Sequence, residues 1–216
     1  MSPTLTIDPR TVLWSVPESV RDESLADNPL LVLMHGRGSQ EHDLFTLAPL
    51  LPAEAVIASL RAPLPLGDGF TWFPAGAPGG PDQEGADAAS IAVLEWLDTV
   101  PQARRVGLLG FSQGGAMSIH LMRHAPERFA AHVCLAGFSI AGVLPADSRL
   151  ETLRPPVFWG RDPADPVITA AAVERTAEWL PSRSTLTERL YTGIGHSISR
   201  EELDDVRNFL RDSGLS

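Results

Sequence analysis

Three side chains in this sequence have the chemistry of a nucleophile, a base and an orienting acid. Ser112 lies at the centre of residues 110–114, Gly-Phe-Ser-Gln-Gly, a G-x-S-x-G pattern between an apolar run and a helical pattern. A serine hydroxyl attacks an acyl carbon only when an imidazole takes its proton and a carboxylate orients that imidazole. His196 follows a glycine, and Asp162 and Asp165 both follow another apolar run. Serine, aspartate and histidine, in that order, predict nucleophilic acyl transfer.

The apolar runs before these residues predict the strands of a buried parallel sheet. The hydrophobicity of residues 30–34 is continuous rather than alternating, which is typical of a strand that helices cover on both faces. The carboxyl ends of parallel strands share one edge, so we expect Ser112, His196 and one of the two aspartates to meet there. The runs are residues 30–34, 56–59, 106–111, 132–136, 156–159 and 185–191.

Helical patterns alternate with these strands, so we expect an α/β fold with a mostly parallel central sheet. The expected helices are residues 41–51 (capped by Ser39), 86–100, 113–123, 168–179 and 201–211. Ser199 and Glu202 form a capping-box pattern before the last helix, and Gly214 follows it. Residues 11–16 read as an edge strand, and residues 18–29 as turns. Nothing indicates a linker or an inserted lid domain, so we expect one domain over residues 1–216.

Residues 60–85 contain too many prolines and glycines to predict regular structure, yet they carry three aromatic side chains. A long loop in a compact domain is usually functional or disordered, and the aromatic residues favour an ordered pocket wall. Their types fit the core equally well. The candidate pocket residues are Phe70, Trp72, Phe73 and also Phe138, which lies in a near-repeat of the serine motif.

The chain resembles the small carboxylesterases of the phospholipase/carboxylesterase group of α/β-hydrolases, relatives of acyl-protein thioesterases. The resemblance covers roughly residues 29–213 and rests on five stretches in the expected order. They are Leu-Met-His-Gly-Arg-Gly (33–38), Trp-Phe (72–73), Gly-Phe-Ser-Gln-Gly-Gly (110–115), Asp-Pro-Val (165–167) and Gly-His-Ser-Ile (195–198).

This resemblance implies that Ser112 is the nucleophile, His196 the base and Asp165 the orienting acid. Asp165 is favoured over Asp162 because Asp-Pro-Val precedes the next helix, as in the family. The backbone N–H groups of Gln113 and Arg37 would then form the oxyanion hole. The family more often has an apolar residue at the position of Arg37, and the spacing before Asp165 is longer than usual.

Composition excludes several other classes of function. The net charge of −10 among 216 residues disfavours a nucleic-acid partner and an anionic membrane surface. All 17 basic side chains are arginine, so lysine chemistry is excluded. The single cysteine, Cys134, cannot form an internal disulfide and reads as a buried apolar residue. No signal peptide or membrane-length apolar run is visible, so we expect a cytoplasmic protein.

We expect no cofactor and no metal, because we find no pair of histidines or cysteines with metal-ligand spacing. His35 reads as structural, and the remaining histidines as surface or helix-face residues: His42, His120, His124 and His132.

The expected activity is therefore hydrolysis of small, soluble, short- to medium-chain carboxylic esters. One alternative is a thioesterase or lysophospholipase acting through the same three residues. Another is a non-catalytic binding module of the same fold. The expected partner is a small-molecule ester, and the expected state is a monomer or a homodimer.

Overall fold

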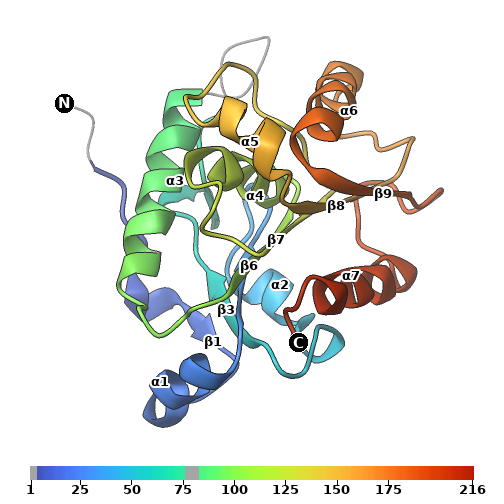
Figure 1. Ribbon diagram of the computed structural model, residues 1–216. Helices are drawn as coiled ribbons and strands as arrows, with labels where there is room; N and C mark the ends of the chain where they lie inside the picture. Colours follow the sequence, from blue (N-terminus) through green and yellow to red (C-terminus); the bar gives the residue numbers. More distant parts are fainter. Residues whose placement is uncertain (1–3, 76–82) are drawn as a thin grey trace.

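A seven-stranded sheet forms the centre of the molecule (Figure 1). The computed structural model describes residues 4–75 and 83–216. The strand order is β1-β3-β2-β6-β7-β8-β9, and every neighbouring pair is parallel except β1 with β3. This confirms the mostly parallel α/β sheet. The strands are β1 (Leu13–Trp14), β2 (Leu30–Met34), β3 (Val56–Leu60), β6 (Val106–Phe111), β7 (Ala131–Leu135), β8 (Pro156–Arg161) and β9 (Thr185–Leu190).

Helices cover both faces of this sheet, with α2 and α7 on one side and α3 to α6 on the other (Figure 1). Within the described residues, no separate inserted domain interrupts this arrangement, and no helix is long and apolar enough to cross a bilayer. The helices are α1 (Glu18–Asp27), α2 (His42–Phe45), α3 (Gln83–Asp98), α4 (Gln113–His124), α5 (Asp147–Leu153), α6 (Ala170–Arg183) and α7 (Arg200–Asp212).

Alternate residues of each strand enter separate cores. In β2, Leu30, Val32 and Met34 pack in the core beneath α3 and α4, while Leu31 and Leu33 pack in the core beneath α2 and α7. All five side chains are fully buried. The continuous apolar pattern therefore reports a strand with no solvent-facing side.

Two N-terminal expectations are wrong. Residues 18–27 form α1 rather than turns, and only Leu25 of this helix is buried. The expected helix over residues 41–51 is reduced to α2 and a short 3-10 helix, Ala48–Leu50, because Pro49 has no N–H to donate. Ser39 does not cap the backbone: its hydroxyl donates to the Asp43 carboxylate at 2.7 Å.

Part of the segment 60–85 is regular. The strands β4 (Leu64–Leu66) and β5 (Gly69–Thr71) form an antiparallel hairpin that turns at Gly67, whose φ is +59°. The N–H of Gly38 donates to the Phe70 carbonyl at 2.7 Å, which ties the hairpin to the loop after β2. The sequence pattern did not predict helix α5 either. Residues 76–82 of the expected loop lie outside the described part of the chain.

The ends of the last helix follow the predicted signals. The Ser199 hydroxyl accepts a hydrogen bond from the Glu202 N–H at 3.0 Å, as an N-cap should. Gly214 has a φ of +73°, in the left-handed region that favours glycine just after a helix.

Candidate active site

The order of the strands places Ser112 at a point where the sheet switches direction. Strand β3 lies on one side of β2 and β6 on the other, so the chain changes direction across the sheet between β2 and β6. At such a point the two loops after the strands diverge and leave room for a ligand. Met34 pairs with Gly110 in the sheet register, so the loop carrying Arg37 and the turn carrying Ser112 begin at the same level.

The turn at Ser112 is strained and depends on glycine neighbours. Ser112 has φ +54° and ψ −115°, an unusual backbone conformation that costs on the order of 1–3 kcal/mol. A Cβ at Gly110 would lie 2.0 Å from the Gly114 carbonyl oxygen, and a Cβ at Gly114 would lie 1.9 Å from the Met34 carbonyl oxygen. No side chain fits between these backbones. The N–H of Ser112 donates to Leu135 at 2.8 Å, which fixes the turn against β7.

A chain of hydrogen bonds joins the predicted serine, histidine and aspartate. The Nε2 atom of His196 lies 2.9 Å from the Ser112 Oγ, and its Nδ1 atom lies 2.7 Å from the Asp165 Oδ2. A carboxylate only accepts hydrogen bonds, so the imidazole proton is on Nδ1 and the Nε2 lone pair faces the serine hydroxyl. The other Asp165 oxygen accepts from the N–H of Val167 at 2.7 Å and of Ile168 at 3.3 Å.

Neighbouring residues limit how the imidazole of His196 can move. The Phe111 ring packs against the His196 ring, with 4.9 Å between their centroids. Behind it, a Cβ at Gly36 would lie only 3.3 Å from the Phe111 ring. The His196 side chain is 17% exposed and the Asp165 side chain 5% exposed, so the imidazole has a wet edge and the carboxylate is shielded.

The competing carboxylate, Asp162, accepts its hydrogen bonds from backbone N–H groups other than those that contact Asp165. Its Oδ1 accepts from the Ala164 N–H at 2.8 Å and its Oδ2 from the Gly195 N–H at 2.7 Å. These bonds, with the nearby N–H groups of residues 193–194, hold the pKa of Asp162 below its ordinary range. Asp162 therefore secures the loop that carries His196, and the carboxylate that contacts the imidazole is Asp165. The resemblance to the family had favoured Asp165 over Asp162 for this role.

The two candidate oxyanion donors lie at the start of α4 and in the loop after β2. Gln113 is the first residue of α4, where a backbone N–H has no partner within the helix. Its side chain is 4% exposed and reaches the hairpin segment: Oε1 accepts from the Trp72 N–H at 3.0 Å, and Nε2 donates to the Phe73 carbonyl at 2.7 Å. Arg37 is exposed, and its backbone N–H makes no hydrogen bond to another described residue.

His35 connects neighbouring loops, as expected for a structural residue. Its Nε2 accepts from the Ala62 N–H at 3.1 Å, so its Nδ1–H donates to the Gly36 carbonyl at 2.7 Å. The Trp72 indole N–H donates to the His35 carbonyl at 2.8 Å. Burial lowers the pKa of His35, so the ring is a neutral connection between loops.

The aromatic candidates divide between core and partly covered positions. Trp72 and Phe73 are 0% and 2% exposed and belong to the core under α3 and α4, which leaves them no surface for a ligand. This burial supports the core alternative that the sequence left open for both residues. Phe70 and Phe138 are partly buried against the same core.

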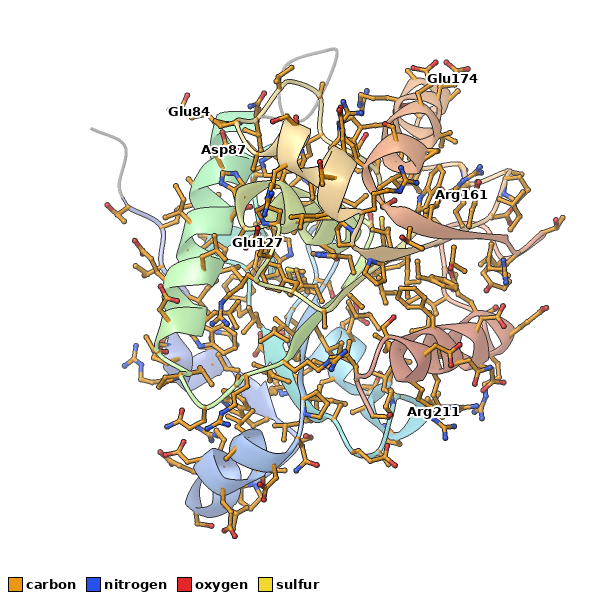
Figure 2. The ribbon with its side chains drawn as sticks, viewed as in Figure 1. Glu84, Asp87, Glu127, Arg161, Glu174 and Arg211 are labelled. Carbon is orange, nitrogen blue, oxygen red and sulfur yellow. The ribbon has the colours of Figure 1, made fainter. Side chains whose placement is uncertain are left out.

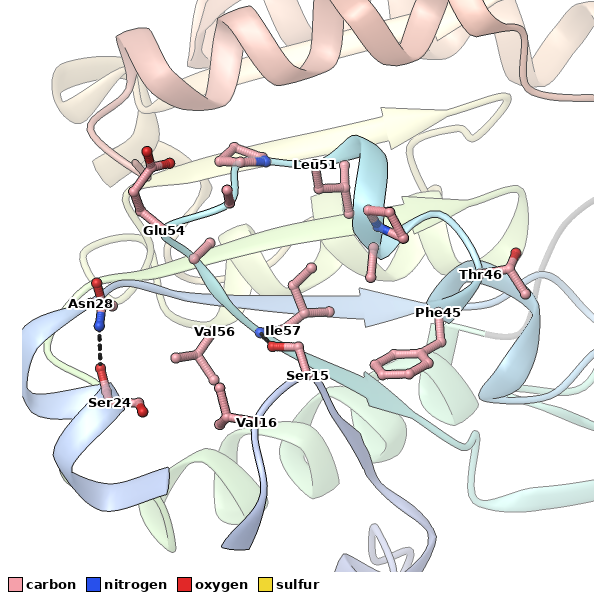
Figure 3. Close-up of a pocket in the computed structure, with 15 residues that line it drawn as sticks. Ser15, Val16, Ser24, Asn28, Phe45, Thr46, Leu51, Glu54, Val56 and Ile57 are labelled. Carbon is pink, nitrogen blue, oxygen red and sulfur yellow. Dashed lines mark hydrogen bonds between the residues drawn. The ribbon is translucent and has the colours of Figure 1, made fainter. Parts of the chain in front are cut away.

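A groove of about 650 Å³ opens elsewhere, beside the edge strand β1 (Figure 3). It lies between α1, β3 and the segment after α2, and Phe45 and Glu54 are among its lining residues. At its floor the Ser15 hydroxyl accepts from the Ile57 N–H at 2.9 Å. None of the candidate catalytic residues lines this groove.

Two histidines that we expected near the surface are buried. His120 and His132 are fully buried, and desolvation by burial lowers the pKa of each to about 4. Cys134 is buried as expected, and burial raises the pKa of its thiol. Contrary to the expectation from the sequence, one pair of histidines does have metal-ligand spacing: His120 and His124 are four residues apart on α4, and both contact Asp87. Histidines at i and i+4 on a helix were the signal that could have found them.

Known proteins with similar sequences include two named for ester chemistry. Acyl-protein thioesterase 1 of Debaryomyces hansenii is 33% identical over 113 residues, which are 51% of this chain and 49% of that protein. A probable carboxylesterase of Oryza sativa subsp. japonica is 28% identical over 124 residues, 54% of this chain and 44% of that protein. The chain thus spans about half the length of the curated relatives it matches.

Solved structures show the same fold. The crystal structure of the Bacillus cereus carboxylesterase covers 94% of this chain and 93% of its own, with a TM-score of 0.77 at 19% sequence identity. The fold is that of the α/β-hydrolases. The phospholipase/carboxylesterase family profile matches residues 87–213, more than half of the sequence. The chain belongs to the phospholipase/carboxylesterase family.

Proposed function

We propose that this protein is a serine hydrolase that cleaves carboxylic esters through an acyl-enzyme intermediate. The observation that carries the proposal is the continuous chain of two hydrogen bonds from Asp165 through His196 to Ser112. In this proposal Ser112 is the nucleophile, His196 the general base and Asp165 the residue that fixes the imidazole tautomer. Membership of the family supports ester hydrolysis as the reaction class.

In the first step the Ser112 Oγ attacks the acyl carbon while the Nε2 of His196 takes the hydroxyl proton. The carbonyl π electrons move to the oxygen, and the N–H groups of Gln113 and Arg37 donate to that oxyanion. The imidazolium is stabilised by Asp165, which keeps its own negative charge. When the tetrahedral intermediate collapses, the bond to the alkoxy oxygen breaks and His196 protonates the departing alcohol.

In the second step a water molecule replaces the alcohol. His196 takes a proton from this water as the water oxygen attacks the acyl carbon, and the same two N–H groups donate to the new oxyanion. Collapse breaks the bond to Ser112 Oγ, which regains its proton from His196. The carboxylic acid leaves, and the resting hydrogen-bond chain is restored.

We infer small, soluble esters with short- to medium-length acyl chains as the substrates. The net charge of −10 disfavours approach to anionic lipid surfaces, which a lysophospholipase would have to reach. A thioesterase is the competing proposal, because the relatives of this chain include a protein named acyl-protein thioesterase 1. The same three residues can cleave either bond.

Matched oxygen and sulfur esters distinguish these proposals. Hydrolysis of a series of acyl chains, each offered as an oxygen ester and as a thioester, gives kcat/KM for the two leaving atoms at equal chain length. We expect the highest kcat/KM with oxygen esters of short and medium chains. A consistent preference for long-chain thioesters would favour the thioesterase. If folded protein hydrolyses neither series, the non-catalytic alternative replaces both.

A further inference from the structure

Three potential metal ligands converge on one point between α3 and α4. The Oδ1 atom of Asp87 lies 2.7 Å from the Nε2 of His120 and 2.9 Å from the Nε2 of His124. These three atoms lie within 4.8 Å of one another. The histidines are four residues apart on α4, so they project from the same side of the helix, and Asp87 approaches from α3. Two different helices thus supply one carboxylate oxygen and two imidazole nitrogens.

The spacing of these atoms suits a tetrahedral ion. Zn²⁺ binds histidine nitrogen and carboxylate oxygen at about 2.0–2.2 Å, which places neighbouring ligand atoms roughly 3.4 Å apart. The contacts of Asp87 with His120 and His124, 2.7 and 2.9 Å, are shorter than this spacing by about 0.7 and 0.5 Å. Displacements of about 0.5–0.7 Å, within the reach of side-chain torsions, would admit the ion.

The hydrogen bonds of the cluster also allow it to take a cation. The Asp87 carboxylate accepts from the Nε2–H of both histidines, and the Nδ1 atom of His120 has no hydrogen-bond partner among the described residues. When an ion takes the Nε2 position of His120, the ring can therefore carry its proton on Nδ1 instead. Arg123, next to His124 in the chain, is already paired with Asp147 through two bonds of 2.8 Å. Asp87 therefore supplies a negative charge that this arginine does not neutralise.

The cluster is buried on one side and open on the other. The side chain of His120 is fully buried, whereas those of Asp87 and His124 are 30% and 19% exposed. Figure 2 shows Asp87 on α3, with Glu84 one turn earlier toward the same end of the helix. Solvent can therefore deliver an ion, and a water molecule can occupy the fourth position that three protein ligands leave vacant.

We propose that Asp87, His120 and His124 form a binding site for a divalent transition-metal ion, with Zn²⁺ as the best fit. Nitrogen and carboxylate ligands favour such ions over Mg²⁺ or Ca²⁺, which prefer oxygen alone. The site is separate from the proposed catalytic residues: His120 lies eight positions after Ser112 along α4, roughly 12 Å along the helix axis. Its effect is to join α3 to α4, the helix that begins at the candidate nucleophile.

The test is a titration of metal-free, tag-free protein with Zn²⁺, followed by calorimetry and by thermal unfolding. The proposal predicts one bound ion per chain and a rise in Tm that follows the Zn²⁺ concentration. Tetrahedral Co²⁺ absorption would report direct coordination. Failure of the wild-type protein to bind Zn²⁺ would overturn the proposal and would leave the cluster as hydrogen-bonded side chains.

Asp87→Asn is the most informative variant, because an asparagine oxygen can still accept from both histidines but carries no charge. His124→Gln is the second, since it changes a partly exposed ligand and spares the buried His120. Each should raise the Kd for Zn²⁺ more than about 100-fold, since loss of even an indirect partner costs 10- to 100-fold. Unchanged affinity in both variants would contradict the proposal.

Two control variants locate the ion. Glu84→Gln removes a neighbouring exposed charge on α3, and His196→Gln removes the histidine of the proposed catalytic site. Both should bind Zn²⁺ with wild-type affinity. Equal loss in Glu84→Gln would show diffuse attraction to acidic side chains, and loss in His196→Gln would move the ion to the catalytic residues. Either result overturns the assignment.

Discussion

The Nε2 atom of His196 lies 2.9 Å from the Oγ of Ser112, although 84 residues separate the two in the sequence. This proximity results from strand order, because both side chains follow strands that end at the same edge of a parallel sheet. The left-handed turn at Ser112 projects its hydroxyl from that edge, and the Asp162 carboxylate secures the loop that brings His196 to it. The proposed chemistry depends on both supports.

The two aspartates after β8 give a matched pair of variants. Asp165→Asn should lower kcat by about 10⁴-fold, because an amide favours the wrong imidazole tautomer. Asp162→Asn weakens only the support of the histidine loop and should cost at most about 100-fold, the effect of a small misplacement. Steady-state kinetics on one ester substrate would measure both. A larger loss in Asp162→Asn would reverse the two assignments.

The glycines that follow Ser112 should be required for folding. Gly114→Ala would place a Cβ 1.9 Å from the Met34 carbonyl oxygen, between two backbones that cannot move apart cheaply. We expect it to lower the free energy of unfolding by more than about 4 kcal/mol.

Gly67→Ala is the control for this effect, since it also changes a glycine but has no atom within 4 Å of the new Cβ. Its cost should be that of its positive φ alone, about 1–2 kcal/mol. Urea unfolding of both variants provides the comparison. A Gly114→Ala variant as stable as Gly67→Ala would show that the turn is not as tightly packed as described.

Glu202 should make stability depend on pH. Its side chain is 1% exposed, and burial raises its pKa from 4.5 to about 7, although the nearby Ser199 N–H favours the charged form. Between these two values the unfolded chain releases a proton that the folded protein retains. The free energy of unfolding should therefore fall by about 3 kcal/mol as pH rises from 4.5 to above 7.

The isosteric variant Glu202→Gln removes this titration. Urea unfolding at several pH values should show the variant gaining stability relative to the wild type as pH rises. Glu201→Gln changes the exposed neighbour in the same helical turn and should not reproduce that gain. Parallel pH profiles for wild type and Glu202→Gln would show that this carboxyl does not carry a proton in the folded protein.

The sheet and the convergence of the three candidate catalytic residues were predictable from the sequence. A strand such as β2 is buried on both faces, so its apolar run is unbroken and the end of the strand is easy to recognise in the sequence. The edge at which the strands end then follows from parallel pairing alone. Residue type and position after β8 could not decide between Asp162 and Asp165, because both are aspartates in one loop. The resemblance alone favoured Asp165, and in the structure the two carboxylates differ in their hydrogen-bond partners.

Other features left no readable periodicity. Helix α1 has a single buried residue, so its charged sequence looks like turns. Helix α4 is the opposite case: it is buried on nearly all sides, and an amphipathic pattern could not reveal that His120 lies inside. The hairpin of β4 and β5 is stabilised by its contact with the loop around Gly38, which is distant in sequence.

The most direct test of the central claim is covalent labelling with a fluorophosphonate, which reacts with an activated serine and mimics the acyl-enzyme step. The proposed mechanism predicts one label per folded chain, located at Ser112 by peptide mass spectrometry. Labelling should be lost in Ser112→Ala and retained in Ser139→Ala, the serine of the near-repeat sequence. Labelling at another residue, or none in folded protein that hydrolyses esters, would contradict Ser112 as the nucleophile.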